Sequence, residues 1–305
     1  TPSFTFKAEI VDTDGDTDSD THTITVTDGT DPQDAVTQSI TLDEDDLSDG
    51  SSPSSSALTQ IATLSFTAGS DTLDSFVFNG TAGLDTDAND GTAGGEIVWV
   101  LNPAATEIKG YVNGNESDGD LAITLTIGGA TSIAPTNSGD VTVTAVLSDE
   151  FANTFGDDSQ TNFNLGSVTV TGSDGDDTVN GIVNVAVIDD VPSVEISADM
   201  TSGSASDTTD SVAEDGSDLT GVITLVEGAD QNATLNVTLE GTDVLGGPIS
   251  FTIDGTYQSQ THTVTTVGDD LLGKLTVDLA TDGTASWTFN PAPDVDHSST
   301  PPSFT

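Results

Sequence analysis

The chain has 305 residues and carries 52 acidic side chains against three lysines, which gives a formal charge of −49 at pH 7. A polyanion of this size excludes nucleic acid as a partner, because its phosphates would be repelled. The lack of cysteine excludes disulfides and thiolate metal sites. A hydrophobic share of 33% with this charge is typical of disorder, so a folded state needs cations from solution among its acids.

Segments in which Val, Ile or Leu alternates with Thr or Asn recur along the chain and predict half-buried β-strands. Disordered chains are poor in β-branched residues, so this pattern favours a folded protein over a disordered one. Many short strands without helical periodicity indicate an all-β chain of tandem, calcium-stabilised β-sandwich modules of immunoglobulin or cadherin type. In chain order, the clearest predicted strands are 23–26, 98–101, 121–127, 141–146, 168–170 and 235–239.

Segments that combine acids with proline, at 31–34 and 188–192, predict the boundaries of a middle module, because proline interrupts strand pairing. We expect residues 31–193 to form one complete β-sandwich. Residues 1–30 are then the closing strands of a sandwich module, and residues 194–305 are the opening part of a second one.

The two ends of the chain share a string of four residues. Pro2-Ser-Phe-Thr5 recurs as Pro302-Ser-Phe-Thr305, and joining the second string to Phe6 would continue a single strand. The repeat suggests a slice of a tandem array cut out of register, and a coincidental match is the alternative. The end segments would then complete one split domain, either within a chain or between neighbouring chains.

The segment from Asp85 to Glu96 has the oxygen spacing of a calcium loop. Oxygen ligands at the first, third, fifth and twelfth places match an EF-hand loop. Its glycine comes one place late and predicted strands flank it, so it is no EF-hand. We expect a calcium-binding loop between strands, and the alternative is a solvated turn. The predicted ligands are Asp85, Asp87, Asn89, Asp90 and Glu96.

Two further runs place glycine between acids just before a Thr/Val strand. Glycine lets the backbone curl so that several carboxylates converge on one ion. Each run is either a calcium site or a solvated acidic turn. The predicted ligands are Asp12, Asp14 and Asp16 in the first run, and Asp174 and Asp176, followed by Asp177, in the second.

Acids at the predicted boundaries form a third group of candidate calcium ligands, which would lock the angle between neighbouring modules. A hydrated linker is the alternative at each position. The group comprises Asp28, Asp31 and Glu44 at one junction, and Asp189, Asp190, Glu214 and Asp215 at the other. Together with the loops, these positions predict that the chain holds several Ca²⁺ ions.

The sequence contains no convincing catalytic set, so we expect a protein without enzymatic activity. No serine stands in a glycine-flanked elbow, and His22, His262 and His297 are isolated, which argues against zinc. No apolar run reaches the roughly 18 residues of a membrane span, so direct insertion into a membrane is not expected. Calcium sites of millimolar affinity fill outside cells, so we predict an extracellular location.

Three segments resemble the type I secretion repeats of the giant RTX adhesins of Gram-negative bacteria. The resemblance covers most of the predicted middle module, and the remaining residues look like a neighbouring sandwich with weaker motifs. The glycine-rich nonapeptide repeats that give the RTX class its name are absent from the sequence. The segments are Leu42 to Ser51, Val141 to Phe151, and Leu165 to Asp177 continued by Val187 to Pro192.

The resemblance implies a cell-surface adhesin involved in cell adhesion and biofilms, whose modules are either ligand-binding domains or calcium-rigidified spacers. Its ligand-binding modules grip the C-terminus of a host or partner surface peptide or protein through a bound calcium, and a glycan is the alternative ligand. The other expected partners are neighbouring modules of the same adhesin. The resemblance places the ligand-binding residues at eight positions, for which an ordinary inter-strand loop is the alternative. The corresponding positions are Asp118, Asp120, Asp149, Glu150, Phe151, Gly156, Asp157 and Asp158.

Overall fold

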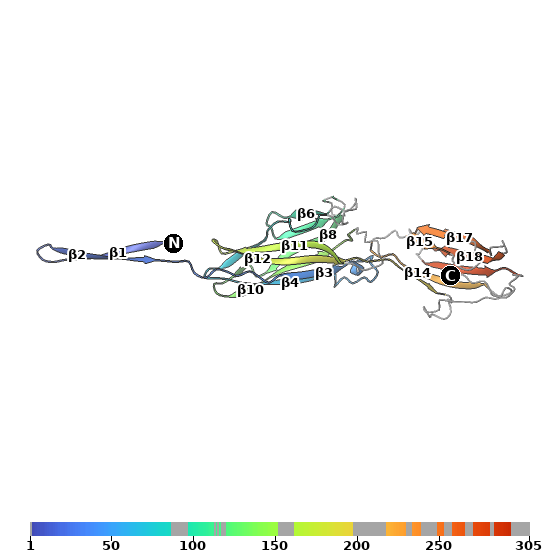
Figure 1. The fold of residues 1–305 in the computed structure, drawn as a ribbon, viewed down its shortest axis with the longest axis horizontal. Helices are drawn as coiled ribbons and strands as arrows, with labels where there is room; N and C mark the ends of the chain where they lie inside the picture. The colour runs from blue at the N-terminus through green and yellow to red at the C-terminus, as the bar shows by residue number, and fades with distance from the viewer. Residues whose placement is uncertain are drawn as a thin grey trace.

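The protein is seen in a computed structural model, which describes residues 2–86, 97–112, 114, 116, 120–151, 162–197, 218–229, 234–238, 249–252, 258–265, 271–280 and 284–293. Within these residues every regular element is a β-strand except the 3-10 turn η1 (Glu44–Asp46). The predicted all-β class is therefore confirmed. A hairpin and two sandwich-like modules follow one another along the long axis of the molecule (Figure 1).

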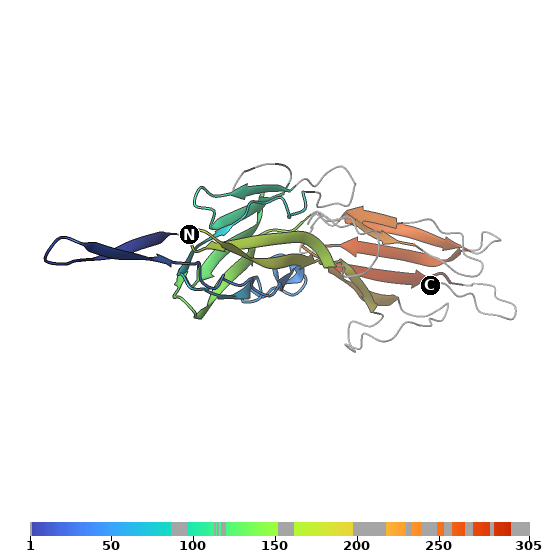
Figure 2. The same ribbon diagram turned by 60° about the vertical axis from the view of Figure 1, so that its left-hand side comes forward.

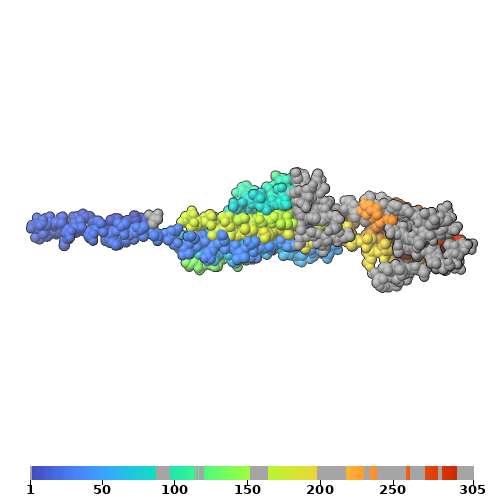
Figure 3. Space-filling view, viewed as in Figure 1, coloured from blue at the N-terminus to red at the C-terminus, as the bar shows by residue number. Residues whose placement is uncertain are grey.

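The first element is a β-hairpin of strands β1 (Ser3–Val11) and β2 (Thr17–Thr25). The two strands pair with each other in antiparallel register and with no other described strand. Every residue of both strands is exposed. In the space-filling view, the hairpin forms a narrow arm that projects from the middle module (Figure 3).

The middle module, defined as residues 38–188, consists of two five-stranded sheets. One sheet has the order β4-β10-β8-β7-β6, and the other has the order β3-β12-β11-β5-β9. Strands β3 and β12 pair in parallel, whereas the other pairs in the module are antiparallel. The strands are β3 (Gln38–Asp43), β4 (Thr59–Thr67), β5 (Leu73–Phe78), β6 (Val98–Leu101), β7 (Glu107–Tyr111), β8 (Leu121–Gly129), β9 (Ser132–Ile133), β10 (Ser138–Leu147), β11 (Asn162–Ser173) and β12 (Thr178–Ile188).

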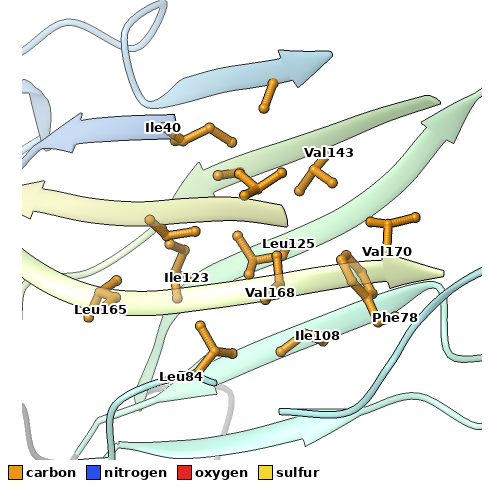
Figure 4. Close-up of a cluster of buried hydrophobic side chains, with 14 of the residues drawn as sticks. Ile40, Phe78, Leu84, Ile108, Ile123, Leu125, Val143, Leu165, Val168 and Val170 are labelled. Atoms are coloured by element: carbon orange, nitrogen blue, oxygen red, sulfur yellow. The ribbon is translucent and has the colours of Figure 1, made fainter. Parts of the chain in front are cut away.

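The hydrophobic core of the middle module lies between its two sheets. In β12, buried and exposed residues alternate along the whole strand, as expected for a strand with one face on a core. Figure 4 shows side chains of both sheets gathered in this core, among them Val168 and Val170 of β11, Leu125 of β8 and Ile108 of β7. Because alternate residues face inward, the Val/Thr pattern of the sequence translates directly into a packed interior.

The third module, defined as residues 193–291, has one five-stranded sheet with the order β13-β14-β19-β18-β17 and a separate pair, β15-β16. Its core cluster is smaller and includes Val277, Leu279 and Phe289, with Trp287 packed against it. The strands are β13 (Ser193–Ser197), β14 (Leu219–Val226), β15 (Thr234–Val237), β16 (Ile249–Thr252), β17 (Gln258–Thr265), β18 (Leu271–Leu279) and β19 (Ala285–Pro291).

The turn after β14 packs against the middle module. Ala229 is fully buried and belongs to the core cluster of the middle module. Gly228 lies so close to the backbone of Asp190 that an added Cβ would stand 2.7 Å from the Asp190 carbonyl oxygen. The long strands of the middle module point toward this junction in a second view (Figure 2). Among the described residues, no helix has the length and apolar character needed to cross a membrane.

Candidate metal sites at the ends of the middle module

Two groups of aspartates in the described part of the chain have carboxylate oxygens that all lie within 4.8 Å of one another. The first, Asp12, Asp14 and Asp16, lies in the turn of the hairpin. The second joins Asp28 to Asp176 and Asp177. These exposed clusters could bind metal ions. We call the first group the hairpin cluster and the second group the linker cluster.

The hairpin cluster is shaped by the carboxylate of Asp12, which folds the turn around itself. Its Oδ1 accepts hydrogen bonds from the backbone amides of Asp14 (3.3 Å), Gly15 (3.0 Å) and Asp16 (2.8 Å). Gly15 adopts a φ of +100°, which an L side chain rarely does. A hydrogen bond with the Asp14 side chain, followed by the amide of Asp16, holds the pKa of Asp12 below its usual range. The turn therefore favours the ionised form of Asp12.

The linker cluster brings Asp28, which lies between β2 and β3, next to the turn between β11 and β12, almost 150 positions later in the sequence. Strands β11 and β12 are joined by a tight turn in which Asp174 Oδ1 accepts a hydrogen bond from the Asp177 amide at 2.8 Å. This turn presents Asp176 and Asp177 toward Asp28, which directly follows the hairpin. The cluster therefore lies where the chain enters the middle module.

Hydrogen bonds fix the linker, residues 26–37 between β2 and β3, beside this cluster. The carbonyl of Thr30 accepts from the amide of Ser70 at 2.8 Å, and the Thr30 amide donates to Ser70 Oγ at 2.6 Å. Further along, the amide of Asn180 donates to Asp34 Oδ1 at 2.6 Å, and the amide of Ala35 donates to the carbonyl of Asn180. The linker is thus held against the ends of β4 and β12.

The pKa values of Asp176 and Asp177 in the linker cluster are raised, in part by repulsion between neighbouring carboxylates. The neighbouring charge of Asp28, and then that of Asp174, raises the pKa of Asp176 above its usual range. Partial desolvation and the charge of Asp31 raise the pKa of Asp177. Carboxylates that repel one another in this way are stabilised by a cation among them.

The opposite end of the middle module holds three buried acids. Glu44, Asp189 and Asp190 have relative exposures of 0%, 4% and 2%. The amide of Phe151 donates to Glu44 Oε1 at 2.8 Å. Ser51 donates to both oxygens of Asp190, from its amide at 2.7 Å and from its hydroxyl at 2.6 Å. Burying carboxylates costs several kcal/mol each unless protons, donors or cations compensate them.

Acids around this end have raised pKa values. Desolvation raises the pKa of Asp43 to about 6, with the charges of Asp45 and Asp46 adding to the effect. Desolvation and the neighbouring Asp149 raise the pKa of Glu150 to about 7. Desolvation also raises the pKa of Asp46. Both ends of the middle module therefore concentrate negative charge that the chain does not offset with its three lysines.

The donor set suits one class of metal ion. Carboxylate and carbonyl oxygens are the ligands that Ca²⁺ and Mg²⁺ prefer, and flexible clusters with several acids suit the larger Ca²⁺. The chain has no cysteine, and neither cluster includes histidine, so soft metals have no matching ligands. A bound Ca²⁺ would supply positive charge and fixed oxygen geometry at either cluster.

The structure separates two boundary acids that the sequence analysis grouped at one junction. Glu44 was expected beside Asp28, but it lies at the opposite end of the middle module. The reason is the parallel pairing of β3 with β12, which sets Asp43 opposite Ile188. Glu44 and Asp189 therefore leave the sheet together. The 11 residues of β12, at about 3.3 Å per residue, put roughly 33 Å between the two ends.

The remaining predicted positions are only partly described. Asp85 is placed at the base of its loop, where its amide donates to the Leu165 carbonyl and the Ile97 amide donates to the Thr86 carbonyl. Phe151 is fully buried in the core, and the Asp120 carbonyl accepts from the Val112 amide. The predicted ligands outside the described residues are Asp87, Asn89, Asp90, Glu96, Asp118, Gly156, Asp157, Asp158, Glu214 and Asp215.

The partnership of Asp28 with Asp177 is the feature that the sequence analysis missed. Both residues belong to noticed acidic groups, but nothing in their spacing connects them. Only the return of β12 beside the linker brings them together. The acid–glycine–acid turn was the usable signal for Asp176 and Asp177, whereas Asp28 offered only its position near the predicted boundary.

The fold and these clusters define the class of protein: an all-β chain of sandwich-like modules with exposed acidic clusters that could bind metal ions. No known protein family matches the chain, and no curated protein matches it in sequence.

One solved structure with some similarity is a chain of a chaperone–tip adhesin complex described as vital for synergistic activation of CFA/I fimbriae biogenesis. The comparison covers 92% of this chain and 97% of that chain, at 8% sequence identity and a TM-score of 0.23. A TM-score this low supports no argument about function.

Proposed function

We propose that the chain is a calcium-dependent extracellular segment of a bacterial surface adhesin, in which bound cations hold consecutive β-sandwich modules at a fixed angle. The single observation that carries the proposal is the linker cluster. Asp28 comes from the connection that enters the middle module, whereas Asp176 and Asp177 come from the module itself. A cation bound to all three would tie the connection to the module.

The buried acids at the other end support the same function. Asp189 and Asp190 end the middle module, and Gly228 of the third module lies against the Asp190 backbone. Glu44 joins them from the start of the module. A cation at this end would neutralise carboxylates that lie between two modules, and it would stiffen the second junction in the same way.

The experiment compares the full chain in calcium and in chelator by small-angle X-ray scattering and calcium titration calorimetry. We expect a smaller spread of dimensions in calcium. The double variant Asp176→Asn/Asp177→Asn should bind one ion fewer, while Glu195→Gln, an exposed acid on β13, should bind as the original does. Identical scattering with and without calcium would contradict the proposal.

Peptide binding by the middle module stays a prediction that rests on the resemblance alone. Four of its eight predicted residues lie outside the described part of the chain, and the described Phe151 is part of the core. Retention of peptides with free C-termini on the immobilised chain, lost in chelator, would support it. Equal retention of peptides with amidated C-termini would argue against recognition of a carboxylate.

A further inference from the structure

Two Asn-Gly pairs of the sequence lie in described parts of the middle module and differ in their surroundings. Asn79 and Gly80 follow directly after β5, whereas Asn180 and Gly181 lie inside β12. An asparagine side chain can react with the backbone nitrogen of the next residue. A following glycine favours this reaction, because it has no side chain to hinder the approach. The fold leaves one of the two pairs open to the reaction and holds the other.

The first pair has open space around it. Asn79 is exposed and lies outside the regular strand. Gly80 adopts a φ of +88°, and a Cβ added to it would meet no atom within 4 Å. Among the backbone hydrogen bonds of the described residues outside regular strands, none engages the amide of Gly80. The peptide between Asn79 and Gly80 can therefore rotate toward the asparagine side chain.

The asparagine of the second pair is held by its backbone and by its side chain. The amide of Asn180 donates to Asp34 Oδ1 at 2.6 Å, and its carbonyl accepts from the amide of Ala35 at 3.0 Å. Its side-chain Oδ1 accepts from the Thr171 hydroxyl at 2.9 Å. The side chain and the main chain of Asn180 are therefore fixed relative to each other.

The glycine of the second pair is fixed as well. Gly181 stands opposite Val170 of β11 in the antiparallel ladder. Because the backbone groups of Asn180 point to the other edge of β12, those of Gly181 point toward β11. A Cβ added to Gly181 would stand 2.9 Å from side-chain atoms of Leu64 and Phe66. Rotation of this peptide would break strand pairing at the face of the core.

We propose that Asn79 is a site of spontaneous deamidation in the folded chain, and that strand pairing protects Asn180 from the same reaction. The Gly80 nitrogen gives up its proton to a base in solution and attacks the side-chain carbonyl carbon Cγ of Asn79. A new C–N bond forms, and the bond between Cγ and Nδ2 breaks. Nδ2 takes up a proton and leaves as ammonia, so that a succinimide ring remains.

Water then opens the ring at one of two bonds. Opening between Cγ and the Gly80 nitrogen leaves an ordinary aspartate in place of Asn79. Opening between the main-chain carbonyl carbon and the same nitrogen leaves isoaspartate, in which the main chain runs through the former side chain and gains one methylene. Water is the only co-reactant and ammonia the only leaving molecule, and no atom is oxidised or reduced.

The extra methylene of isoaspartate would fall between two anchors in the core. Phe78 precedes the site and Leu84 follows it, and they are 2% and 6% exposed. Both belong to the core of the middle module (Figure 4). The Phe78 amide donates to the Ala105 carbonyl at 2.7 Å, and Leu84 forms a bridge with Gly166. The short segment 79–83 must absorb the longer backbone, so the isoaspartate form should melt at a lower temperature.

The aspartate product should disturb the fold less. It adds one carboxylate to a chain that already carries a charge of −49, and it keeps the length of the backbone. The Asn79 amide donates to the Thr169 carbonyl at 2.9 Å, and this bond lies on the side of the residue that the reaction does not alter. No cation takes part in any step, so the reaction does not depend on the proposed calcium function.

Peptide mapping by mass spectrometry tests the proposal on the full, folded chain stored in a mildly alkaline buffer. Alkali promotes the reaction because the Gly80 nitrogen must lose its proton. We expect the peptide that contains Asn79 to convert at least about tenfold faster than the peptide that contains Asn180. A tenfold difference corresponds to about 1.4 kcal/mol for local opening of β12. Equal conversion of both peptides, or faster conversion of Asn180, would overturn the proposal.

Storage of the same chain in guanidinium separates the effect of the fold from that of the neighbouring residues. Unfolding removes the surroundings of both pairs, so the two peptides should convert at similar rates. The ratio of the rates should therefore fall toward one. A ratio that remains about tenfold in guanidinium would assign the difference to local sequence and contradict protection by β12.

Two variants separate the longer backbone from the added charge. Asn79→Gln should stop conversion at this position, because the longer side chain closes a ring far more slowly, and its melting temperature should not change during storage. The stored original chain should develop a lower-melting fraction that grows with its isoaspartate content, measured by chromatography of the peptides. Freshly prepared Asn79→Asp should melt as the fresh original chain does. An equally low melting temperature for Asn79→Asp would contradict the role of the backbone.

Discussion

The middle and third modules share the strand order of one sheet and differ in the other. In the middle module the hairpin of β11 and β12 lies within the second sheet, between β3 and β5, and the core cluster includes residues of both sheets. In the described part of the third module, the second sheet is the pair β15-β16, and the core cluster has fewer members. Among the described residues, the larger core cluster thus accompanies the module whose second sheet holds the β11–β12 hairpin.

Calcium removal should produce the largest difference between the two modules. Each site filled at 100 times its dissociation constant adds about 2.7 kcal/mol to the free energy of unfolding. Among the described residues, the acids of the linker cluster and the buried acids lie in or beside the middle module. Hydrogen exchange in chelator should therefore rise more in residues 38–188. A larger rise in the third module would contradict this assignment.

Truncation of a core phenylalanine should be the next largest effect and should differ between the modules. Phe78→Ala leaves a cavity in an extended core and should cost about 3–5 kcal/mol, because Phe78 is only 2% exposed. Phe289→Ala should lie at the low end of that range, because its smaller cluster can collapse around the gap. Unfolding in guanidinium, monitored by hydrogen exchange in each module, measures the loss of stability for both variants. Equal costs would show that the third module is packed as well as the middle one.

Acidification should stabilise the middle module when calcium is absent. The pKa of Asp43 is about 6 and that of Glu150 about 7 in the folded state, above their usual values of 3.8 and 4.5. The folded state therefore binds more protons in this range, and stability is lost as pH rises through about 6–7.

The acids that face these two carboxyls are Asp45 and Asp46 near Asp43, and Asp149 and Asp49 near Glu150. In chelator, the melting temperature should rise as the pH falls from about 8 to about 5. In calcium the rise should shrink, because protons compete with the ion for carboxylates. A lower melting temperature at the acidic pH in chelator would contradict the expected sign.

Neutralising the linker cluster should have the smallest effect, with a sign that depends on calcium. In chelator, Asp176→Asn/Asp177→Asn removes repulsion from Asp28 and Asp31, so the melting temperature should rise slightly. In calcium the same variant loses ligands, so the melting temperature should fall. Glu195→Gln serves as the control and should change little in either condition. The same sign in both conditions would show that the cluster holds no ion.

Local chemistry determined several of the strands. The alternation at 98–101 became β6 with the predicted bounds, and the runs at 121–127 and 141–146 lie inside β8 and β10. Alternating β-branched residues specify a half-buried strand without reference to its neighbours. The acid–glycine–acid runs likewise marked both hairpin turns, because glycine permits the positive φ that such turns need.

Tertiary structure decided which acids meet. The sequence alone determined that carboxylates gather at turns and boundaries, but not that Asp28 joins Asp177, or that Glu44 shares an end with Asp189. Those partnerships follow from strand pairing, and above all from the parallel alignment of β3 with β12. A periodic pattern fixes which face of a strand is buried, whereas pairing direction depends on segments more than a hundred residues away. The positions of the acids along the chain could therefore be predicted from the sequence. Which acids lie together in space could be seen only in the tertiary structure.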